Sequence, residues 1–566
     1  MTHCARTAAR SAAASLAFAC ACAVALTVPA LGQSVPSAPS PGAQPQVTRA
    51  DVLRGAYGPF RANNDLLSYE LDVRVDPSRK FISGVNRIRF RMLEDASRIQ
   101  IDLFANLDVD RILFKSEPLT YEREINAVFV DFPQPLRKGR TYEIAFHYSG
   151  HPTEAGRFGG ITFRKDPAGR DWTNTACQHV GASVWWPNKD QYRDEVEHMR
   201  LRVAVPNSLM DVSNGRFEGK KDLGDGYTRW DWRIHYPINS YNVSLNIGRY
   251  EHFTDTADGQ RLDFYCLPES LGKARAQFAQ ARKIMQAFQK AVAPYPFPKD
   301  GYKLIEAPYS GMEHQSAVTY GNRFANGYLG RDWTGVGIST KFDFIIVHES
   351  AHEWFGNSVT ADDSCHEWIH EAWGTYLEGV YVEHLWGKAD AVKYLNGYQG
   401  KVRNRDPIVP PCGASRTPPQ DMYFKGALFL NTLRSVIDDD ARWAGLVRGF
   451  YDRFKYRNIS TDDVVRFFNE RTGMALTPIF DQYLRHAALP VLELRLDETK
   501  GAVAYRWKAD AEGFAMPVKV GRREAWTTIR PTAEWQTLPW AGGTDAFEVA
   551  TDLYFITVEK KGPGPF

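Results

Sequence analysis

The pentapeptide HESAH at residues 348–352 places two histidines four positions apart, and an apolar run at residues 342–347 leads into it. Such a run is typical of a helix buried in a core. Because residues i and i+4 lie on one face of an α-helix, the rings of His348 and His352 project together. Two imidazoles so placed can bind one zinc ion, and Glu349 between them can act as a base toward a metal-bound water. A five-residue pattern also occurs by chance on buried helices, so the interpretation needs a further ligand.

Glu371 supplies that ligand in the stretch WIHEAWGTYLE at residues 368–378. Eighteen residues separate it from His352, which is enough chain to leave one helix, turn and enter another. Two histidines and one glutamate leave a fourth zinc position open, as in catalytic rather than structural sites. Glu378 lies about two turns further along the same helical face. It is either a partner of a ligating histidine or a solvated carboxylate.

Three separated segments together resemble a known family. HESAHEWFGNSVT at residues 348–360, followed by WIHEAWGTYLE, is similar to the zinc aminopeptidases of the gluzincin class, the group of membrane alanyl aminopeptidase and leukotriene A hydrolase. YSGMEH at residues 309–314 stands where that family has G-x-M-E-N. YFKG at residues 423–426 stands where it has Y-x-K-G. Three motifs in the family's order are far more specific than any one of them.

The resemblance implies a role for each matching residue. One zinc ion would be held by His348, His352 and Glu371, with Glu349 as general base. Tyr423 would donate a hydrogen bond to the tetrahedral oxyanion.

The resemblance also implies how a substrate is held. Glu313 would pair with the α-ammonium of a peptide, and Gly311 and Met312 would contact the substrate. Gln178, in the stretch TACQH at residues 175–179, would help to hold the substrate's N-terminus. The implied partners are therefore peptides with a free N-terminus.

The sequence departs from the family pattern at three positions. Ser310 replaces the first glycine of G-x-M-E-N, His314 replaces its asparagine, and His370 stands where an asparagine usually precedes the third ligand. None of these changes removes a ligand or the base, so they put specificity in doubt more than activity. We expect His314 and His370 to be packed surface rings rather than pH-sensitive contacts.

The N-terminal sequence predicts that the protein is exported from the cytoplasm. Arg6 and Arg10 precede an apolar run at residues 12–28, and small residues follow before Gln33, so residues 1–32 are predicted to be a signal peptide. An uncleaved membrane anchor or a lipid-modified cysteine is the less favoured alternative. The protein is expected to be periplasmic or secreted. Residues 33–50 are predicted to be a Pro/Ser-rich linker.

The net charge argues against nucleic-acid binding, and the cysteines bear on possible disulfide bridges. The chain carries 69 basic and 67 acidic residues, a net charge of +2, so it has no electrostatic footprint for nucleic acid. Four of its seven cysteines lie beyond the predicted cleavage site, and an oxidising compartment would allow them to pair. Cys365 and Cys412 are the first choice for a bridge, and free buried thiols are the alternative.

Hydrophobic periodicity predicts a multidomain α+β fold. Alternating segments such as 69–75, 87–91, 199–205 and 241–247 indicate a large N-terminal antiparallel β domain over residues 51–252. Residues 253–488 are predicted to form a thermolysin-like zinc peptidase domain that contains helices at 271–292, 426–437, 441–454, 460–472 and 478–484. Strand patterns return over residues 489–566 and predict a small C-terminal β-sandwich domain. Many relatives continue with a helical domain that this short bacterial-type form would lack, which predicts a more open cleft.

Three functions compete on these residues. The favoured one is a zinc aminopeptidase that removes the N-terminal residue of peptides. The second is an endopeptidase or an epoxide hydrolase using the same site. The third is a catalytically silent peptide-binding relative, which a lost ligand, base or tyrosine would favour, and none is lost.

Overall fold

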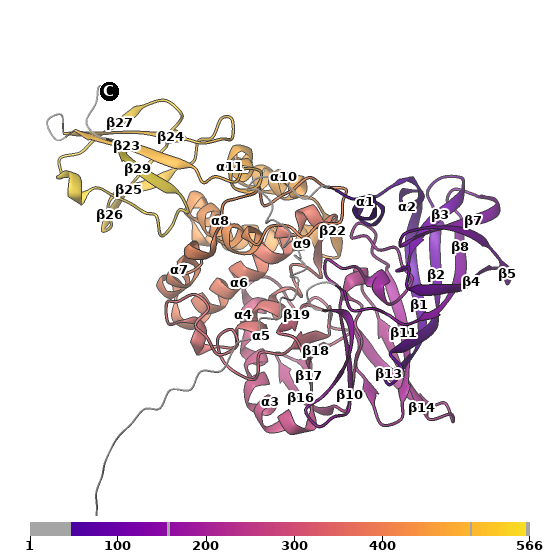
Figure 1. Ribbon diagram of the computed structural model, residues 1–566. Helices are drawn as coiled ribbons and strands as arrows, with labels where there is room; N and C mark the ends of the chain where they lie inside the picture. The colour runs from indigo at the N-terminus through magenta and orange to yellow at the C-terminus, as the bar shows by residue number, and fades with distance from the viewer. Residues whose placement is uncertain (1–46, 156–158, 498–500, 562–566) are drawn as a thin grey trace, which may run out of the picture. The chain divides into compact units, whose positions relative to one another are not determined.

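A computed structural model describes residues 47–155, 159–497 and 501–561 of the 566-residue chain (Figure 1). The predicted signal peptide at 1–32 and most of the predicted linker at 33–50 lie outside the described residues. The last positions of that linker enter α1 (Arg49–Gly55), which begins where the side chain of Thr48 caps the backbone N–H of Asp51. A second short helix, α2 (Pro59–Ala62), leads into the first strand.

The N-terminal part is built around an eight-stranded sheet of order β13-β14-β11-β1-β2-β8-β4-β5. Within β1, Leu71, Val73 and Val75 are buried while the residues between them are partly exposed, so one face of the strand packs into the core. All pairings in this sheet are antiparallel except β1 with β11, which run parallel. The strands are β1 (Asn64–Asp76), β2 (Phe81–Met92), β4 (Leu107–Phe114), β5 (Glu117–Pro118), β8 (Thr141–Gly150), β11 (His198–Pro206), β13 (Arg216–Asp222) and β14 (Tyr227–Ile234).

Two smaller sheets complete this part of the chain. One has the order β3-β7-β6 and the other β12-β15-β10-β9. Their strands are β3 (Ala96–Asp102), β6 (Thr120–Glu124), β7 (Ala127–Leu136), β9 (Gly160–Lys165), β10 (Asp171–Ala176), β12 (Met210–Asp211) and β15 (Asn246–Gly248).

The strand predicted at 241–247 is wrong for most of its length. Residues Ser240–Asn242 form a 3-10 turn that the side chain of Asn239 caps, and β15 begins only at Asn246. The cause is tertiary, because the polar groups of this segment bond to other parts of the chain. The Tyr241 hydroxyl donates to Glu313, and the Asn242 amide donates to Asn357.

The middle of the chain combines a five-stranded sheet with a group of helices (Figure 1). The sheet has the order β16-β17-β18-β20-β19 and comprises β16 (Glu251–Ala257), β17 (Gln260–Cys266), β18 (Tyr302–Glu306), β19 (Gly311–Met312) and β20 (Val318–Tyr320). The helix predicted at 271–292 is divided at Ala279 into α3 (Leu271–Phe278) and α4 (Gln280–Ala291). The remaining helices are α5 (Phe344–Ala351), α6 (Trp368–Trp386), α7 (Lys388–Asn396), α8 (Asp421–Ile437), α9 (Asp440–Phe454), α10 (Thr461–Thr472) and α11 (Thr477–Leu484). A parallel pair, β21 (Val359–Ala361) and β22 (Arg457–Ile459), ties the segment after α5 to the segment before α10.

The C-terminal part contains two sheets, of order β27-β24-β23-β29 and β26-β25-β28. Their strands are β23 (Val491–Asp497), β24 (Ala502–Lys508), β25 (Val518–Arg522), β26 (Ala525–Ile529), β27 (Gln536–Pro539), β28 (Glu548–Val549) and β29 (Thr557–Lys561). The predicted α+β fold class, with a large N-terminal β region, a helical middle region and a small C-terminal β region, is confirmed. None of the helices in the described ranges has the length and apolar character that crossing a membrane requires.

Candidate active site

The structure brings His348, His352 and Glu371 together from two helices. His348 lies in α5, His352 is the residue that ends this helix, and Glu371 lies in the first turn of α6. The two histidine Nε2 atoms are 3.3 Å apart, and Glu371 Oε2 lies 3.6 Å from His348 Nε2 and 3.4 Å from His352 Nε2. Four ligands placed at zinc's usual bond lengths of about 2.0–2.2 Å in a tetrahedron are ~3.4 Å from one another. The three atoms therefore stand at the corners that one zinc ion would require.

The polar groups around these ligands support the same interpretation. Glu371 Oε2 is buried and has no hydrogen-bond partner among the described residues. His348 Nδ1 donates to Glu378 Oε1 at 2.7 Å, and His352 Nδ1 donates to the carbonyl oxygen of Phe355 at 3.0 Å. These bonds leave both Nε2 lone pairs directed at the common point, which is the tautomer that a metal-binding histidine needs. The residues present fit a zinc ion.

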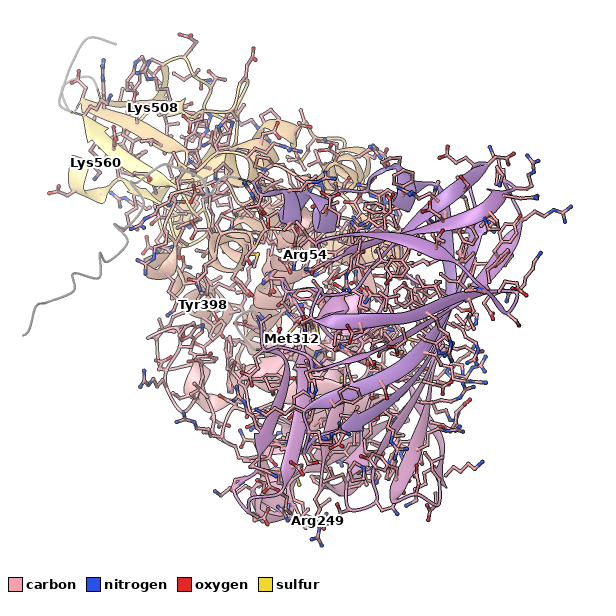
Figure 2. The ribbon with its side chains drawn as sticks, turned by 45° about the vertical axis from the view of Figure 1, so that its right-hand side comes forward. Arg54, Arg249, Met312, Tyr398, Lys508 and Lys560 are labelled. Carbon is pink, nitrogen blue, oxygen red and sulfur yellow. A yellow bond between two sulfur atoms is a disulfide. The ribbon has the colours of Figure 1, made fainter. Side chains whose placement is uncertain are left out.

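Glu378 is a partner of the predicted ligand His348 rather than a solvated carboxylate. It is fully buried, and its second oxygen accepts hydrogen bonds from the hydroxyls of Tyr394 and Tyr398. Tyr398 is labelled in Figure 2. Carboxylates in this position orient the ring and increase the basicity of the ligand.

Two glycines allow close packing around the histidines and Glu349. A Cβ atom at Gly374 of α6 would lie 2.7 Å from Cε1 of His352, so α6 could not approach α5 as closely with a larger residue. A Cβ atom at Gly311 of β19 would lie 2.7 Å from Oε1 of Glu349. Gly311 therefore gives the Glu349 carboxylate room. Met312 beside it, which is labelled in Figure 2, is buried.

Glu349 has the environment of a proton acceptor that works near neutral pH. Its side chain is buried beside the ligands. Burial raises the pKa of the carboxyl to about 7, while His348 and His352 oppose that shift. A group with a pKa near the working pH can both take up and release a proton.

Glu313 and Gln178 meet at the edge of the ligand group. Glu313 Oε1 accepts from Gln178 Nε2 at 2.8 Å and from the hydroxyl of Tyr241 at 3.1 Å. Burial raises the pKa of Glu313 to about 8, and the carboxylates of Glu371 and Glu349 add to the shift. A buried carboxylate of this kind is costly to ionise unless a cation joins it.

Tyr423 lies in the first turn of α8, beside the ligand His348. Its ring centroid is 6.0 Å from that of His348, and the residue is only half-buried. Burial and the carboxylates of Glu371, Glu367 and Glu313 raise the pKa of Tyr423 well above its usual value, so the hydroxyl keeps its proton. Lys425 points elsewhere, because its Nζ donates to the carbonyl oxygens of His486 and Ala487.

The histidines at 314 and 370 are not surface rings, so that expectation is wrong. Both side chains have no exposed area. His370 Nε2 accepts a hydrogen bond from the backbone N–H of Ala361 at 2.8 Å. Burial lowers the pKa of each ring to about 3, which keeps both neutral at physiological pH.

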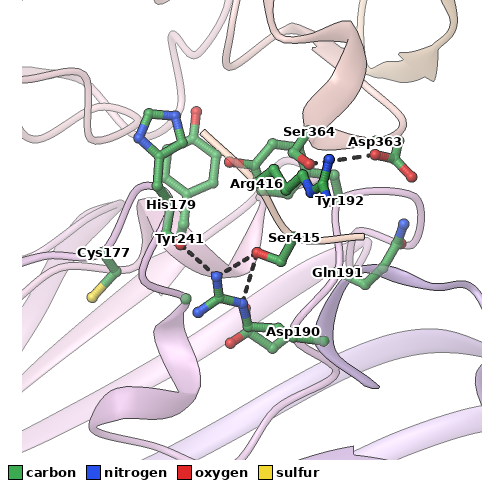
Figure 3. A pocket seen from close by; sticks show the side chains of 13 residues that line it. Cys177, His179, Asp190, Gln191, Tyr192, Tyr241, Asp363, Ser364, Ser415 and Arg416 are labelled. Carbon is green, nitrogen blue, oxygen red and sulfur yellow. Dashed lines mark hydrogen bonds between the residues drawn. The ribbon is translucent and has the colours of Figure 1, made fainter. Parts of the chain in front are cut away.

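The sequence did not point to Glu367, His179 or Arg54. Glu367, the residue before α6, is fully buried, and its Oε2 lies 2.6 Å from His179 Nε2. Arg54 of α1 holds the loop that carries His179 by donating to the carbonyl oxygens of His179 and Val180. Figure 3 shows a pocket that His179, Tyr241, Ser415 and other residues line. Arg54 also lines this pocket. No short pattern marks these residues, because they meet only in the folded chain.

Cys365 and Cys412 form a disulfide, while Cys177 and Cys266 are free and buried. The bridge joins the 3-10 turn Ser364–His366, which precedes α6, to the segment before α8. Asp363 supports the same junction by accepting from the backbone N–H groups of Cys365 and Gly413. The favoured cysteine pair is thus the one that the structure contains.

Comparison with known proteins finds similarity over the part of the chain that carries the zinc-ligand motifs. Residues 277–483 match the model of the peptidase family M1 domain. The chain is 23% identical over 349 residues to endoplasmic reticulum aminopeptidase 1 of Homo sapiens, a match that covers 59% of this chain and 36% of the human protein. It is 23% identical over 310 residues to a leucyl aminopeptidase of Saccharolobus solfataricus, covering 52% of this chain and 39% of the relative. The chain therefore spans well under two thirds of the length of these curated relatives.

Solved structures share the fold. A mutant form of an M1 zinc metallopeptidase of Deinococcus radiodurans, bound to the substrate Tyr-Ser-Ala, superposes with a TM-score of 0.62 at 20% identity, covering 75% of this chain and 94% of the other. A further structure of the M1 zinc metallopeptidase from that organism gives a TM-score of 0.60 at 21% identity, covering 75% of this chain and 93% of the other. The resemblance to the zinc aminopeptidases is confirmed, and both zinc-ligand motifs lie within residues 277–483, which match the peptidase family M1 domain.

Proposed function

We propose that this protein is an aminopeptidase that uses one zinc ion to hydrolyse the first peptide bond of peptides with a free N-terminus. The observation that carries the proposal is the placement of one non-ligating carboxylate, Glu313, beside the ligand triad. Gln178 Nε2 lies within hydrogen-bond distance of both Glu313 and the ligand Glu371. An ammonium group held by Glu313 would therefore lie close to the metal position, which fixes the first peptide bond as the one that reacts.

His348, His352 and Glu371 would hold the zinc ion. When bound, zinc supplies a polarised water and a Lewis acid for the scissile carbonyl. Glu349 accepts the proton of the attacking water at its carboxylate and passes it to the leaving amine. The hydroxyl of Tyr423 donates a hydrogen bond to the oxyanion that develops on the carbonyl oxygen.

Glu313 is the residue that recognises the N-terminus of the peptide substrate. A charge-assisted hydrogen bond between its carboxylate and an α-ammonium offsets the cost of burying both charges. Tyr241 orients the Glu313 carboxylate through its Oε1, and in the free protein Gln178 donates to the same oxygen. An acylated amine would bring no charge and only one N–H donor.

The test is the substitution Glu313→Ala, followed by kinetics and metal analysis. We expect kcat/KM for short free peptides to fall by ~10²-fold or more, while about one zinc per chain is retained. Products of the wild type should differ from the substrate by one N-terminal residue in mass spectra. Cleavage of internal bonds before terminal ones would favour the endopeptidase alternative. Absence of turnover on every peptide, with zinc bound, would favour the silent binding relative.

We also propose that the protein works outside the cytoplasm. The proposal rests on the signal-peptide pattern at residues 1–32, and the Cys365–Cys412 disulfide supports it, since such bridges persist in oxidising compartments. Fractionation of cells that express the full chain, with N-terminal sequencing of the product, tests both the location and the predicted cleavage before Gln33.

A further inference from the structure

Three carboxylates converge on one nitrogen of the free protein. Gln178 Nε2 lies 2.8 Å from Glu313 Oε1, 3.0 Å from Glu367 Oε1 and 3.2 Å from Glu371 Oε1. A primary amide has only two N–H donors, so it can satisfy two of these three acceptors at once. A primary ammonium has three N–H donors and a positive charge. The group of acceptors is therefore better matched to an ammonium than to the amide that occupies it.

Among the three carboxylates, Glu367 is the one whose Oε1 oxygen has no evident structural role. The residue is fully buried, and its other oxygen, Oε2, pairs with His179 Nε2 at 2.6 Å. Its position just before α6 suits a carboxylate, because the first turn of a helix carries a partial positive charge. Oε1 is thus left facing the shared nitrogen of Gln178.

His179 holds Glu367 in this orientation. Its backbone has φ of 65°, in the left-handed region that few residues other than glycine adopt. Arg54 donates to the carbonyl oxygen of His179 at 2.7 Å and to that of Val180 next to it. A conformation of this kind persists where surrounding contacts impose it, and the His179 imidazole Nε2 lies 2.6 Å from Glu367 Oε2.

We propose that Glu367 determines specificity by completing, with Glu313 and Glu371, a three-carboxylate receptor for the substrate's α-ammonium. In the free protein the Gln178 amide holds the place of that ammonium, and a bound peptide displaces it. The inference rests on the proposed function, since it names the residue that gives the amine subsite its third acceptor. Glu367 would contact the substrate, and His179 would act on it only as a positioning residue.

The test measures peptide affinity in a protein that cannot turn the peptide over. In the Glu349→Gln background, titration calorimetry would give the dissociation constants of Leu-Gly-Gly and of its des-amino analogue, 4-methylpentanoyl-Gly-Gly. Adding Glu367→Gln should weaken binding of the free peptide by about 10- to 100-fold, the usual weight of a hydrogen bond to a charged group. The affinity for the des-amino peptide and the zinc content should not change.

Two further variants separate recognition from folding. Glu383→Gln makes the same substitution on α6 at a carboxylate paired with Arg434, and it should leave both affinities unchanged. His179→Gln should weaken the free peptide less than Glu367→Gln does, because the third acceptor remains.

Three results would overturn the inference: equal losses for the free and des-amino peptides, an unchanged affinity in Glu367→Gln, or an effect of His179→Gln as large as that of Glu367→Gln. Failure of the proposed function looks different. In that case the wild type would not cleave Leu-Gly-Gly, whatever Glu367 contributes to its binding.

Discussion

Neighbouring carboxylates in the site have distinct tasks that their contacts define. Glu371 presents an oxygen with no partner among the described residues, as a ligand requires, and Glu378 fixes the ring of His348. Glu349 lies on the same helix as His348, and its pKa of about 7 suits it to exchange a proton. Glu371 Oε2 and Glu378 act on the metal position, the first directly and the second through His348.

Substitution of the proposed base, Glu349, distinguishes its role in catalysis from any role in metal binding. Glu349→Gln keeps the size of the side chain but cannot accept a proton. We expect kcat to fall by ~10²–10⁴-fold or more while about one zinc per chain remains bound. Steady-state kinetics with metal analysis of the same sample checks this. Turnover near that of the wild type would show that another group takes the proton.

Tyr423→Phe removes only a hydroxyl from the half-buried side chain beside His348. Loss of one oxyanion donor lowers kcat by about 10²–10³-fold, and KM should change little because the contact forms mainly in the transition state. The comparison needs full saturation curves for both proteins. If KM rises and kcat is kept, Tyr423 binds the substrate instead.

Sequence motifs and the family resemblance predicted the site residues that lie in recognisable motifs, and missed those that do not. HESAH and the spacing to Glu371 predicted the ligand triad, since helical geometry brings the two histidines to one face, and the resemblance predicted Glu313, Gln178 and Tyr423. Glu367 and His179 are 188 residues apart, and only the fold makes them neighbours. His314 and His370 were misjudged because a histidine in a short pattern gives no sign of its burial.

At the scale of elements, α6 organises the site. In its first three turns this helix carries Glu371, Gly374 and Glu378, and Glu367 precedes it. Its apolar residues are buried on almost every side, and the sequence indicated this helix only through the spacing of Glu371 and Glu378. The strand predicted at 241–247 failed because hydrogen bonds to Glu313 and Asn357 decide that segment, and no local pattern reports them.

The Cys365–Cys412 bridge anchors the segment before α8 to the turn before α6. The two cysteines are 47 residues apart, and closing a loop of that size is worth up to about 4 kcal/mol in the unfolded chain. Cys365→Ser with Cys412→Ser should lower the free energy of unfolding by about 2–4 kcal/mol, measured by chemical denaturation without reductant. Equal stability of the two proteins would mean that native contacts alone secure this junction.

At the scale of the whole described chain, the N-terminal β region supplies part of the site. Gln178 follows β10, and Tyr241 lies in the turn before β15, yet both bond to Glu313. The large β region was predicted from alternation. The parallel pairing of β1 with β11 was not, because alternation does not report the direction of a neighbouring strand.

Asp211 of β12, which lies outside the candidate active site, makes the stability of the folded chain depend on pH. It is fully buried, its Oδ2 accepts from Ser213 and Trp232, and burial raises its pKa to about 8. The folded chain therefore keeps a proton that the unfolded chain releases above its ordinary pKa of about 3.9. The stability from this proton is fully present at low pH and is lost as the pH rises through about 8.

Asp211→Asn removes this titration. Relative to that variant, the wild type should lose about 1.4 kcal/mol of unfolding free energy for each pH unit between about pH 5 and about pH 7. Denaturation curves of both proteins across this range provide the measurement. A difference between them that does not vary with pH would show that Asp211 is ionised in the folded protein.

We propose above all that Glu313, a carboxylate beside the predicted zinc ligands, makes this protein recognise the free N-terminus of a peptide. The most direct measurement is the ratio of kcat/KM for one peptide with a free amine and for the same peptide N-acetylated, using the zinc-loaded full chain. The account predicts removal of one residue at a time from the free peptide and near-inertness of the acetylated one, because acetylation removes the charge that Glu313 binds. Equal cleavage of the two peptides would contradict it.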